Sequence, residues 1–524
     1  MTRINTNVPS MIAQRNLRTN NLDLNTSLER LSTGLRINRG KDDPAGLIAS
    51  ENLRSEMRGL DAAIKNSERA DQVANIAEGG LQEIAALLTE LQGLVTETAN
   101  TAGLSREEKE ANQLQVDSIL QTIDRLASAT SFQGLKLLNG NLDYQTEGIA
   151  TEVAAFNVRG AKLGYNETLD VNVVVVQSAQ VGGFLLSMGG TDINLGGAGG
   201  DDGNDQQFVL EVKGALGARE LSFSSGTTLA TMADAINTFK SVTGVKAVQS
   251  GTGLRLESTE YGADQFVGVD VVDDGGIGSA SNIGIYNLED NDANTAQTTI
   301  TSTFADAANG LLDRGVDIEA TINGIVATTR GTVAQINTDF LDVELDLVYD
   351  TGSSNPNAAR LGAITAFTIT GGGADFQLAS RVDIAGKVSL GIQNVAVRGL
   401  GKSAVTDDAG AVTDYFLKDI GTGRDLNMVD GDLTVAQGII DRSIREVNSL
   451  RGRLGSFQQN VIGATIRSLG IALENTTAAE SVIRDTEFAS ETSRLTQAQV
   501  LSNSATNALA LANAAPQSVL QLLG

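Results

Sequence analysis

The central part of the sequence holds two groups of acidic residues whose spacing could bind a cation. Asp342, Glu344 and Asp346 alternate along a short apolar run, so on a strand their carboxylates share one face. Residues 196–205 (GGAGGDDGND) have the composition of a Gly/Asp calcium-binding repeat, but such sites are built by stacking several copies, and the chain has one. We interpret both groups as solvated acidic surface, and the sequence predicts neither a metal site nor a cofactor.

The composition excludes most catalytic chemistry. The chain has no His and no Cys, which removes imidazole acid–base catalysis, thiol nucleophiles, disulfides and Cys/His zinc sites. No phosphate-binding loop and no nucleophile–base arrangement can be found. We therefore predict that the protein is not an enzyme.

Charge argues against nucleic acid as a partner. The chain of 524 residues carries 64 acidic and 38 basic residues, a net charge of −26. Residues 139–430 alone contain 38 acidic and 16 basic residues, so the middle holds most of the excess and suits a solvated outer surface. No apolar run reaches the roughly 18 residues of a membrane span, and the N-terminus lacks a signal-peptide core. We expect no membrane insertion, and any export would use no cleaved signal.

The chemistry that the sequence does support is association between helices. Residues 17–38 carry a narrow leucine seam at intervals of seven, four, three and four, and a C-terminal stretch rich in alanine carries a second stripe. A seam this thin needs a partner helix, which we expect to be the opposite terminus and then other copies of the chain. The predicted self-assembly residues are Leu17, Leu24, Leu28, Leu31, Leu35, Leu495, Leu501 and Leu509.

Helical spacing continues through residues 44–138 and returns near residue 431. Asp43 before Pro44 is a favourable helix start, and Ser105 with Glu108 forms a capping box that opens another helix. This pattern predicts an antiparallel bundle, although on pattern alone an ordinary soluble bundle without an assembly role fits equally well. The predicted bundle core comprises Leu53, Met57, Leu60, Val116, Ile119, Leu126, Ile444 and Leu454.

The composition of the middle of the chain predicts β-structure. Gly and Asp/Asn residues become dense there, and short Val/Ile/Thr-rich runs replace the helical period. The predicted fold class is α+β, a long coiled-coil-like helical bundle from both termini with a large β-rich central insertion. The predicted domains are a core helix at 1–43, a first bundle half with a hairpin at 44–180, β-rich outer lobes at 181–370, a return hairpin with the second bundle half at 371–480, and a core helix at 481–524.

Several motifs resemble bacterial flagellins. The N-terminal ones are residues 4–7 (INTN), 13–17 (AQRNL), 27–38 (SLERLSTGLRIN) and 41–47 (KDDPAGL), and the C-terminal ones run from Asp485 and Glu491 through residues 508–510 to Leu522 and Leu523. Leu511 stands where the family usually has glutamine, and Glu487 where aspartate is common. Residues 222–272 resemble the small β-α-β-β module of flagellins and hook-associated proteins. The zinc protease that some flagellins embed in this region is impossible here without histidine.

The resemblance implies a structural subunit that polymerises into the flagellar filament for motility. The terminal helices would fold on assembly and form the filament core, and the acidic centre would face outward. Implied partners are other copies of the chain, an export chaperone, and the filament cap and hook-junction proteins. The implied location is extracellular, after type III export. A hook–filament junction protein, which shares the same terminal helices, is the alternative.

Flagellins are also detected by a host Toll-like receptor, and the resemblance places its contact face near residues 88–94 and on a facing helix. Family members recognised by the receptor carry an arginine and a glutamate there. This chain has Glu90 and Gln115 at the matching positions, beside Leu88 and Leu94. We therefore expect weak recognition.

Overall fold

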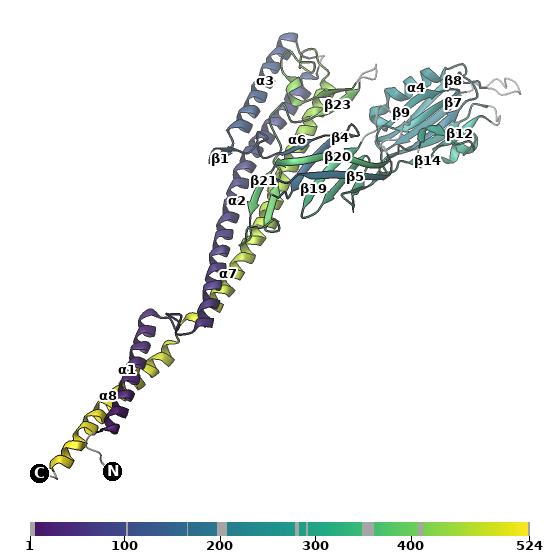
Figure 1. The fold of residues 1–524 in the computed structure, drawn as a ribbon. Helices are drawn as coiled ribbons and strands as arrows, with labels where there is room; N and C mark the ends of the chain where they lie inside the picture. Colours follow the sequence, from purple (N-terminus) through teal and green to yellow (C-terminus); the bar gives the residue numbers. More distant parts are fainter. Residues whose placement is uncertain are drawn as a thin grey trace. The chain divides into compact units, whose positions relative to one another are not determined.

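The computed structural model describes residues 6–100, 103–164, 166–195, 207–277, 282–289, 292–347, 361–406 and 412–521. Helices fill both terminal regions and antiparallel strands fill the centre (Figure 1), which confirms the α+β prediction. The chain divides into two compact units. The first contains Met1–Glu78, Phe376–Val388 and Arg451–Gly524, and the second contains Gly79–Asp375 and Ser389–Leu450. The domain boundaries predicted from the sequence stay predictions.

The first unit is mainly helical. Its hairpin of β21 (Ala374–Gln377) and β22 (Lys387–Leu390) packs on α2, where the Asn66 amide donates to the Gln377 carbonyl oxygen at 3.3 Å. A single π-helical segment, Phe457–Ile462, interrupts the C-terminal helices. The helices of this unit are α1 (Val8–Thr33), the first part of α2 (Pro44–Thr98), the end of α6 (Leu433–Ser456), α7 (Gly463–Arg484) and α8 (Phe488–Gln521).

Helix α1 covers most of the predicted leucine seam at 17–38 but ends before the seam does. Asn7 caps its start by accepting a hydrogen bond from the Ser10 amide. Gly34 ends it in the left-handed region at φ +73°, where a side chain would be strained. Placing Leu35 on the helical seam is therefore wrong, because Leu35 forms an isolated antiparallel β-bridge with Asp485 instead.

The second unit contains the helical bundle of α3 (Arg106–Ala129) with the later part of α2 and most of α6. The predicted capping box is present, with Ser105 and Glu108 each accepting the other's amide. The Asn112 amide donates to the Thr98 hydroxyl at 3.0 Å, which ties α3 to α2. The Gln92 amide donates to Asp441 at 2.6 Å, which ties α2 to α6.

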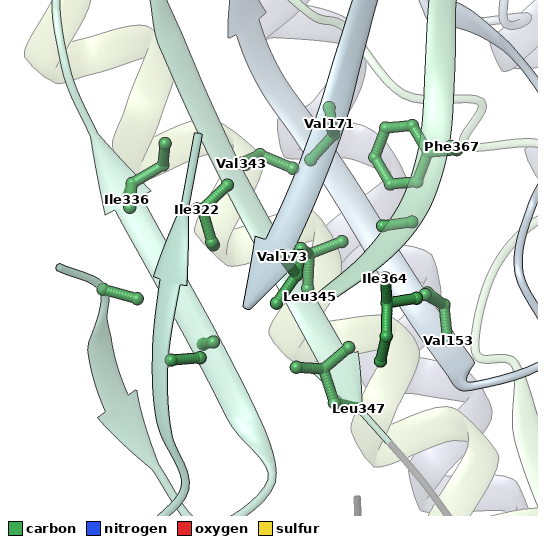
Figure 2. Packing of buried hydrophobic residues seen from close by; sticks show 14 of the residues in the cluster. Val153, Val171, Val173, Ile322, Ile336, Val343, Leu345, Leu347, Ile364 and Phe367 are labelled. Carbon is green, nitrogen blue, oxygen red and sulfur yellow. The ribbon is translucent and has the colours of Figure 1, made fainter. Parts of the chain in front are cut away.

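Two antiparallel sheets beside the bundle share one hydrophobic cluster. Val173 on β5 pairs with Ile322 on one side and Ile364 on the other, and all three are buried in one cluster with Val343 of the second sheet (Figure 2). The first sheet runs β16 (Ile325–Val326), β15 (Glu319–Ile322), β5 (Leu169–Gln177), β20 (Gly362–Gly372) and β3 (Tyr144–Glu147). The second runs β17 (Thr328–Arg330), β18 (Val333–Asn337), β19 (Leu341–Leu347) and β4 (Val153–Ala161).

A second cluster lies between two further sheets and a helix. Helix α4 (Leu229–Thr238) buries Met232 and Ile236 against Phe208 and Leu254. One sheet runs β13 (Asp292–Ala296), β12 (Gly284–Glu289), β6 (Gly183–Ser187), β10 (Gly253–Ser258) and β9 (Val245–Ser250). The other runs β14 (Leu311–Arg314), β11 (Phe266–Asp273), β7 (Gln207–Gly214) and β8 (Gly217–Ser224).

Short elements complete the described chain. They are β1 (Ser131–Phe132), β2 (Leu135–Lys136), β23 (Ser403–Thr406), β24 (Val412–Tyr415), α5 (Lys240–Thr243) and the 3-10 turns η1 (Asp306–Asn309) and η2 (Leu417–Ile420).

Candidate assembly surface

The first and last helices of the chain form an antiparallel pair. Near one end, the Asn7 amide donates to the Ala512 carbonyl oxygen at 2.8 Å. Further along, the Asn20 amide donates to the Leu501 carbonyl oxygen at 3.1 Å. At the other end Arg30 lies 3.7 Å from Glu491. Residue numbers rise along α1 as they fall along α8, so the two helices are antiparallel. The contacts are spread along both helices, which lie side by side over most of their length (Figure 1).

Small side chains fill the contact between α1 and α8. Ser10, Ser27, Ala498 and Ala505 are buried there, and the Ser10 hydroxyl lies 2.7 Å from the Asn513 side-chain oxygen. Such residues let two helix backbones approach closely, but they bury little apolar surface. The sequence predicted a contact stretch rich in alanine near the C-terminus. It did not predict the two buried serines, which fall outside the leucine seam.

The eight predicted assembly leucines are not buried in the single chain. Leu28 is 47% exposed and Leu501 is 45% exposed, and the other six lie at intermediate exposure. Further apolar side chains on the same two helices are also exposed, namely Val8, Met11, Ile12, Leu22, Val500 and Leu511. Exposed apolar side chains grouped on two paired helices are typical of surfaces that bind other protein molecules.

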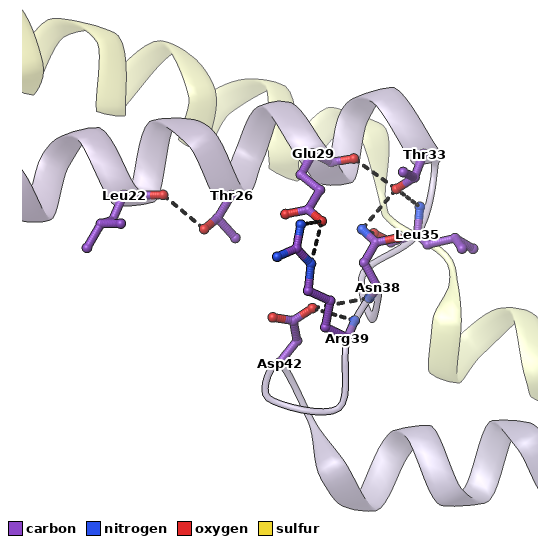
Figure 3. A network of polar contacts seen from close by, with 8 residues as sticks. All are labelled: Leu22, Thr26, Glu29, Thr33, Leu35, Asn38, Arg39 and Asp42. Atoms are coloured by element: carbon purple, nitrogen blue, oxygen red, sulfur yellow. Dashed lines mark hydrogen bonds and ion pairs between the residues drawn. The ribbon is translucent and has the colours of Figure 1, made fainter.

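A polar network holds the chain reversal after α1 (Figure 3). Asn38 donates to the Thr33 hydroxyl at 2.9 Å, and Arg39 pairs with Glu29 at 2.9 Å. The Asp42 carboxylate accepts the amides of Arg39 and Asn38 at 2.9 and 3.2 Å. The Arg39 amide first, and the Asn38 amide after it, hold the pKa of Asp42 below its usual value of 3.8.

A second set of contacts fastens this reversal to the end of α7. The Arg36 guanidinium donates to the Ile483 carbonyl oxygen at 2.6 Å, and the Arg36 amide donates to the Arg484 carbonyl oxygen at 2.7 Å. Arg484 pairs with Glu51 on α2 at 2.8 Å. Arg484 and then Arg54 lower the pKa of Glu51 from its usual 4.5. The conformation after α1 therefore depends on the start of α2 and the end of α7.

The acidic residue Glu491 is buried beside two arginines. Its side chain is 6% exposed and lies 3.7 Å from both Arg30 and Arg494, outside ordinary hydrogen-bond range. Its Oε1 atom is buried and has no hydrogen-bond partner. Arg494 lies on the same helix as Glu491, whereas the contact with Arg30 joins α8 to α1. The sequence prediction assigned Glu491 no structural role.

The predicted bundle-core residues lie in helical interfaces, buried to different degrees. Val116 and Leu454 are completely buried, and Leu60 and Ile119 are 6% and 7% exposed. Leu53, Met57, Leu126 and Ile444 are partly exposed. The predicted core includes Leu53, Met57 and Leu60 of α2 but not the later seam of this helix, where Leu81, Ile84, Leu88 and Leu91 are all fully buried.

The four receptor-facing positions divide into two groups. Leu88 and Leu94 are buried at 0% and 9% exposure, so they pack inward. Glu90 and Gln115 are exposed on α2 and α3. Only these two of the four positions are open to a receptor on the folded chain.

The acidic groups of the centre show no metal-binding arrangement in the described residues. Glu344 is paired with Arg159, and Asp346 accepts the Thr332 hydroxyl at 2.6 Å. The described residues contain no group of three His, Cys, Asp or Glu side chains that could hold a metal ion, and no described helix is long and apolar enough to cross a bilayer. Residues 196–205, the second acidic group, lie outside the described residues.

Three family models and several known proteins are similar to this chain. The family model of the bacterial flagellin N-terminal helical region matches residues 4–143, that of the C-terminal helical region matches 437–523, and that of the flagellin hook IN motif matches 192–260. Flagellin B of Helicobacter pylori is 25% identical over 543 residues, covering 99% of this chain and 99% of the relative. Flagellin of Aquifex aeolicus is 28% identical over 566 residues, covering 100% of this chain and 99% of the relative. The solved FliC structure from Burkholderia pseudomallei has 14% identity and a TM-score of 0.22, covering 75% of this chain and 99% of that one.

Proposed function

The chain belongs to the bacterial flagellin family and is a structural subunit of the flagellar filament, and we propose that its terminal helices drive the polymerisation. The supporting observation is the apolar surface that α1 and α8 leave exposed, including Leu28 and Leu501. Full burial of a leucine contributes about 1.5–3 kcal/mol, so burying the remaining half of each against neighbouring copies contributes about 1 kcal/mol. Many such contacts per subunit would stabilise a polymer.

We propose that folding of the terminal pair is coupled to this assembly. The buried residues of the pair are two serines, two alanines and Glu491, so the isolated pair gains little from apolar burial. Ordering each residue costs about 1–2 kcal/mol of backbone entropy, and helices without packing partners are marginal in water. Neighbouring subunits would supply the missing burial. A contact that repeats without closing on itself produces an open helical filament.

The acidic centre would face outward in the filament and keep it soluble, since residues 139–430 hold most of the negative charge. Export in an unfolded state to the cell exterior, capture by an export chaperone, and contact with the filament cap and hook-junction proteins are further parts of this proposal. The receptor interaction is expected to be weak because Glu90 and Gln115 replace the charges that the family uses.

Seeded growth of the purified protein tests the proposal. Electron microscopy should show long filaments, and the double variant Leu28→Ala/Leu501→Ala should raise the critical concentration about tenfold or more through loss of about 2 kcal/mol per subunit. Leu312→Ala is the matched control, because this leucine is 56% exposed on β14. The control should grow like the wild type.

Two outcomes would contradict this reading. Wild-type protein that remains monomeric beside seeds would refute the filament function. Assemblies that stop at a short, fixed length would favour the hook–filament junction alternative, since such a protein caps one end and does not polymerise indefinitely.

A further inference from the structure

The terminal helix pair has opposite charge at its two ends. Residues 6–22 of α1 and 499–521 of α8, which form one end, carry two basic residues and no acidic residue. Residues 23–33 and 485–498, which form the other end, carry five acidic and two basic residues. Because the helices are antiparallel, these charges do not mix along the pair.

The basic residues at the first end have no partner in their own chain. Arg15 and Arg18 are exposed, and the described residues give their guanidinium groups no ion pair and no hydrogen bond. Positions 18 and 23 are five apart, or about 140° around a helix, so Arg18 does not reach Asp23 on its own helix.

Most of the acidic residues at the second end are already satisfied. Glu29 is paired with Arg39, Glu491 lies between two arginines, and Asp485 accepts the Ser481 hydroxyl. Asp23 and Glu487 are exposed and make no side-chain contact within the described part of the chain. Each end of the pair therefore presents two unpaired charges of one sign.

Building on the proposed filament function, we propose that successive copies are aligned by ion pairs from Arg15 and Arg18 of one copy to Asp23 and Glu487 of the next. The partner is a second copy because the free positive and negative charges lie at different positions along the same helix pair, so a copy shifted along the helix axis brings them together, and such a shifted contact repeats without closing. A polyanionic partner at the two arginines is opposed by the chain's net charge of −26. The apolar surface supplies the affinity, whereas the charges set the axial register and speed docking.

Charge reversal tests this pairing in the full-length protein. The first variant is Arg15→Glu/Arg18→Glu, the second is Asp23→Arg/Glu487→Arg, and the third combines all four changes. At low salt, each double variant should elongate from matching seeds at least about tenfold more slowly than wild type, and the combined variant should recover most of the rate. Higher salt should slow the wild type and reduce its advantage over the double variants.

Lys240→Glu in the central lobe is the control for charge alone, because Lys240 is exposed there and should not affect elongation. Far-UV circular dichroism confirms that each variant keeps the helical content of the wild type. Double variants that elongate at the wild-type rate, or a combined variant as slow as the doubles, would overturn the pairing while leaving the filament function intact. Wild-type protein that fails to elongate at any salt concentration would overturn both.

Discussion

Truncating Leu88 separates a core role from a receptor-contact role on α2. Leu88 is completely buried, as are Leu81, Ile84 and Leu91 along the same seam. Removing three carbon atoms from such a site leaves a cavity, and Leu→Ala changes in well-packed cores cost about 2.7–5 kcal/mol. We expect Leu88→Ala to lower the free energy of unfolding by about 3 kcal/mol, roughly a hundredfold in the unfolding equilibrium. Urea denaturation of the monomer, followed by the helical circular dichroism signal, measures this change.

Glu90→Ala is the matched substitution two residues along the same helix. Its side chain is exposed, so the free energy of unfolding should change by less than about 0.5 kcal/mol. In a Toll-like receptor reporter assay, Glu90→Arg should raise the response because it restores the charge that the family resemblance implies. A Leu88→Ala variant that unfolds at the wild-type urea concentration would refute the assignment of Leu88 to the core.

Two further substitutions test the backbone and the chain reversal. A methyl group in Gly401→Ala would clash with the Ser443 hydroxyl oxygen and lie 2.7 Å from the Ile439 carbonyl oxygen, at a φ of +70°, so calorimetry should show a clearly lower melting temperature. For Asp42, a lowered folded-state pKa means that its stabilisation is present above the ordinary value of 3.8 and is lost as the pH falls through the folded-state value. Asp42→Asn should therefore destabilise the reversal at pH 7, and the difference from wild type should shrink as the pH falls below 3.8, as measured by hydrogen exchange at the Arg39 and Asn38 amides.

The sequence predicted those elements whose signals are local. Asp43 before Pro44 marks the start of α2, and the Asp43 carboxylate accepts the Gly46 amide at 2.9 Å. Ser105 and Glu108 form the predicted capping box at the start of α3. The sequence did not predict the end of α1 at Thr33, because Leu35 continues the heptad spacing beyond it. Gly34, just after the helix, has the left-handed conformation that stops a helix. A one-residue backbone preference outweighed a five-residue side-chain pattern.

Positions fixed by distant contacts could not be read from spacing. The bridge between Leu35 and Asp485, and the contact between Arg30 and Glu491, join segments at opposite ends of the chain. No local rule specifies which residues of one terminus meet which residues of the other. The direction of the pair follows only once several such contacts are known together.

Similar leucine spacing led to two different degrees of burial, and the number of neighbouring helices explains the difference. The later part of α2 is tied to both α3 and α6, so its Leu81 and Leu91 are completely enclosed. Helix α1 pairs with α8, through small residues, and Leu28 stays half exposed. A heptad pattern therefore specifies the face that must be covered but not what covers it. Under the proposed function, neighbouring copies cover the remaining apolar surface of α1 and α8, which is why an assembly defect without a stability defect is the diagnostic result for Leu28.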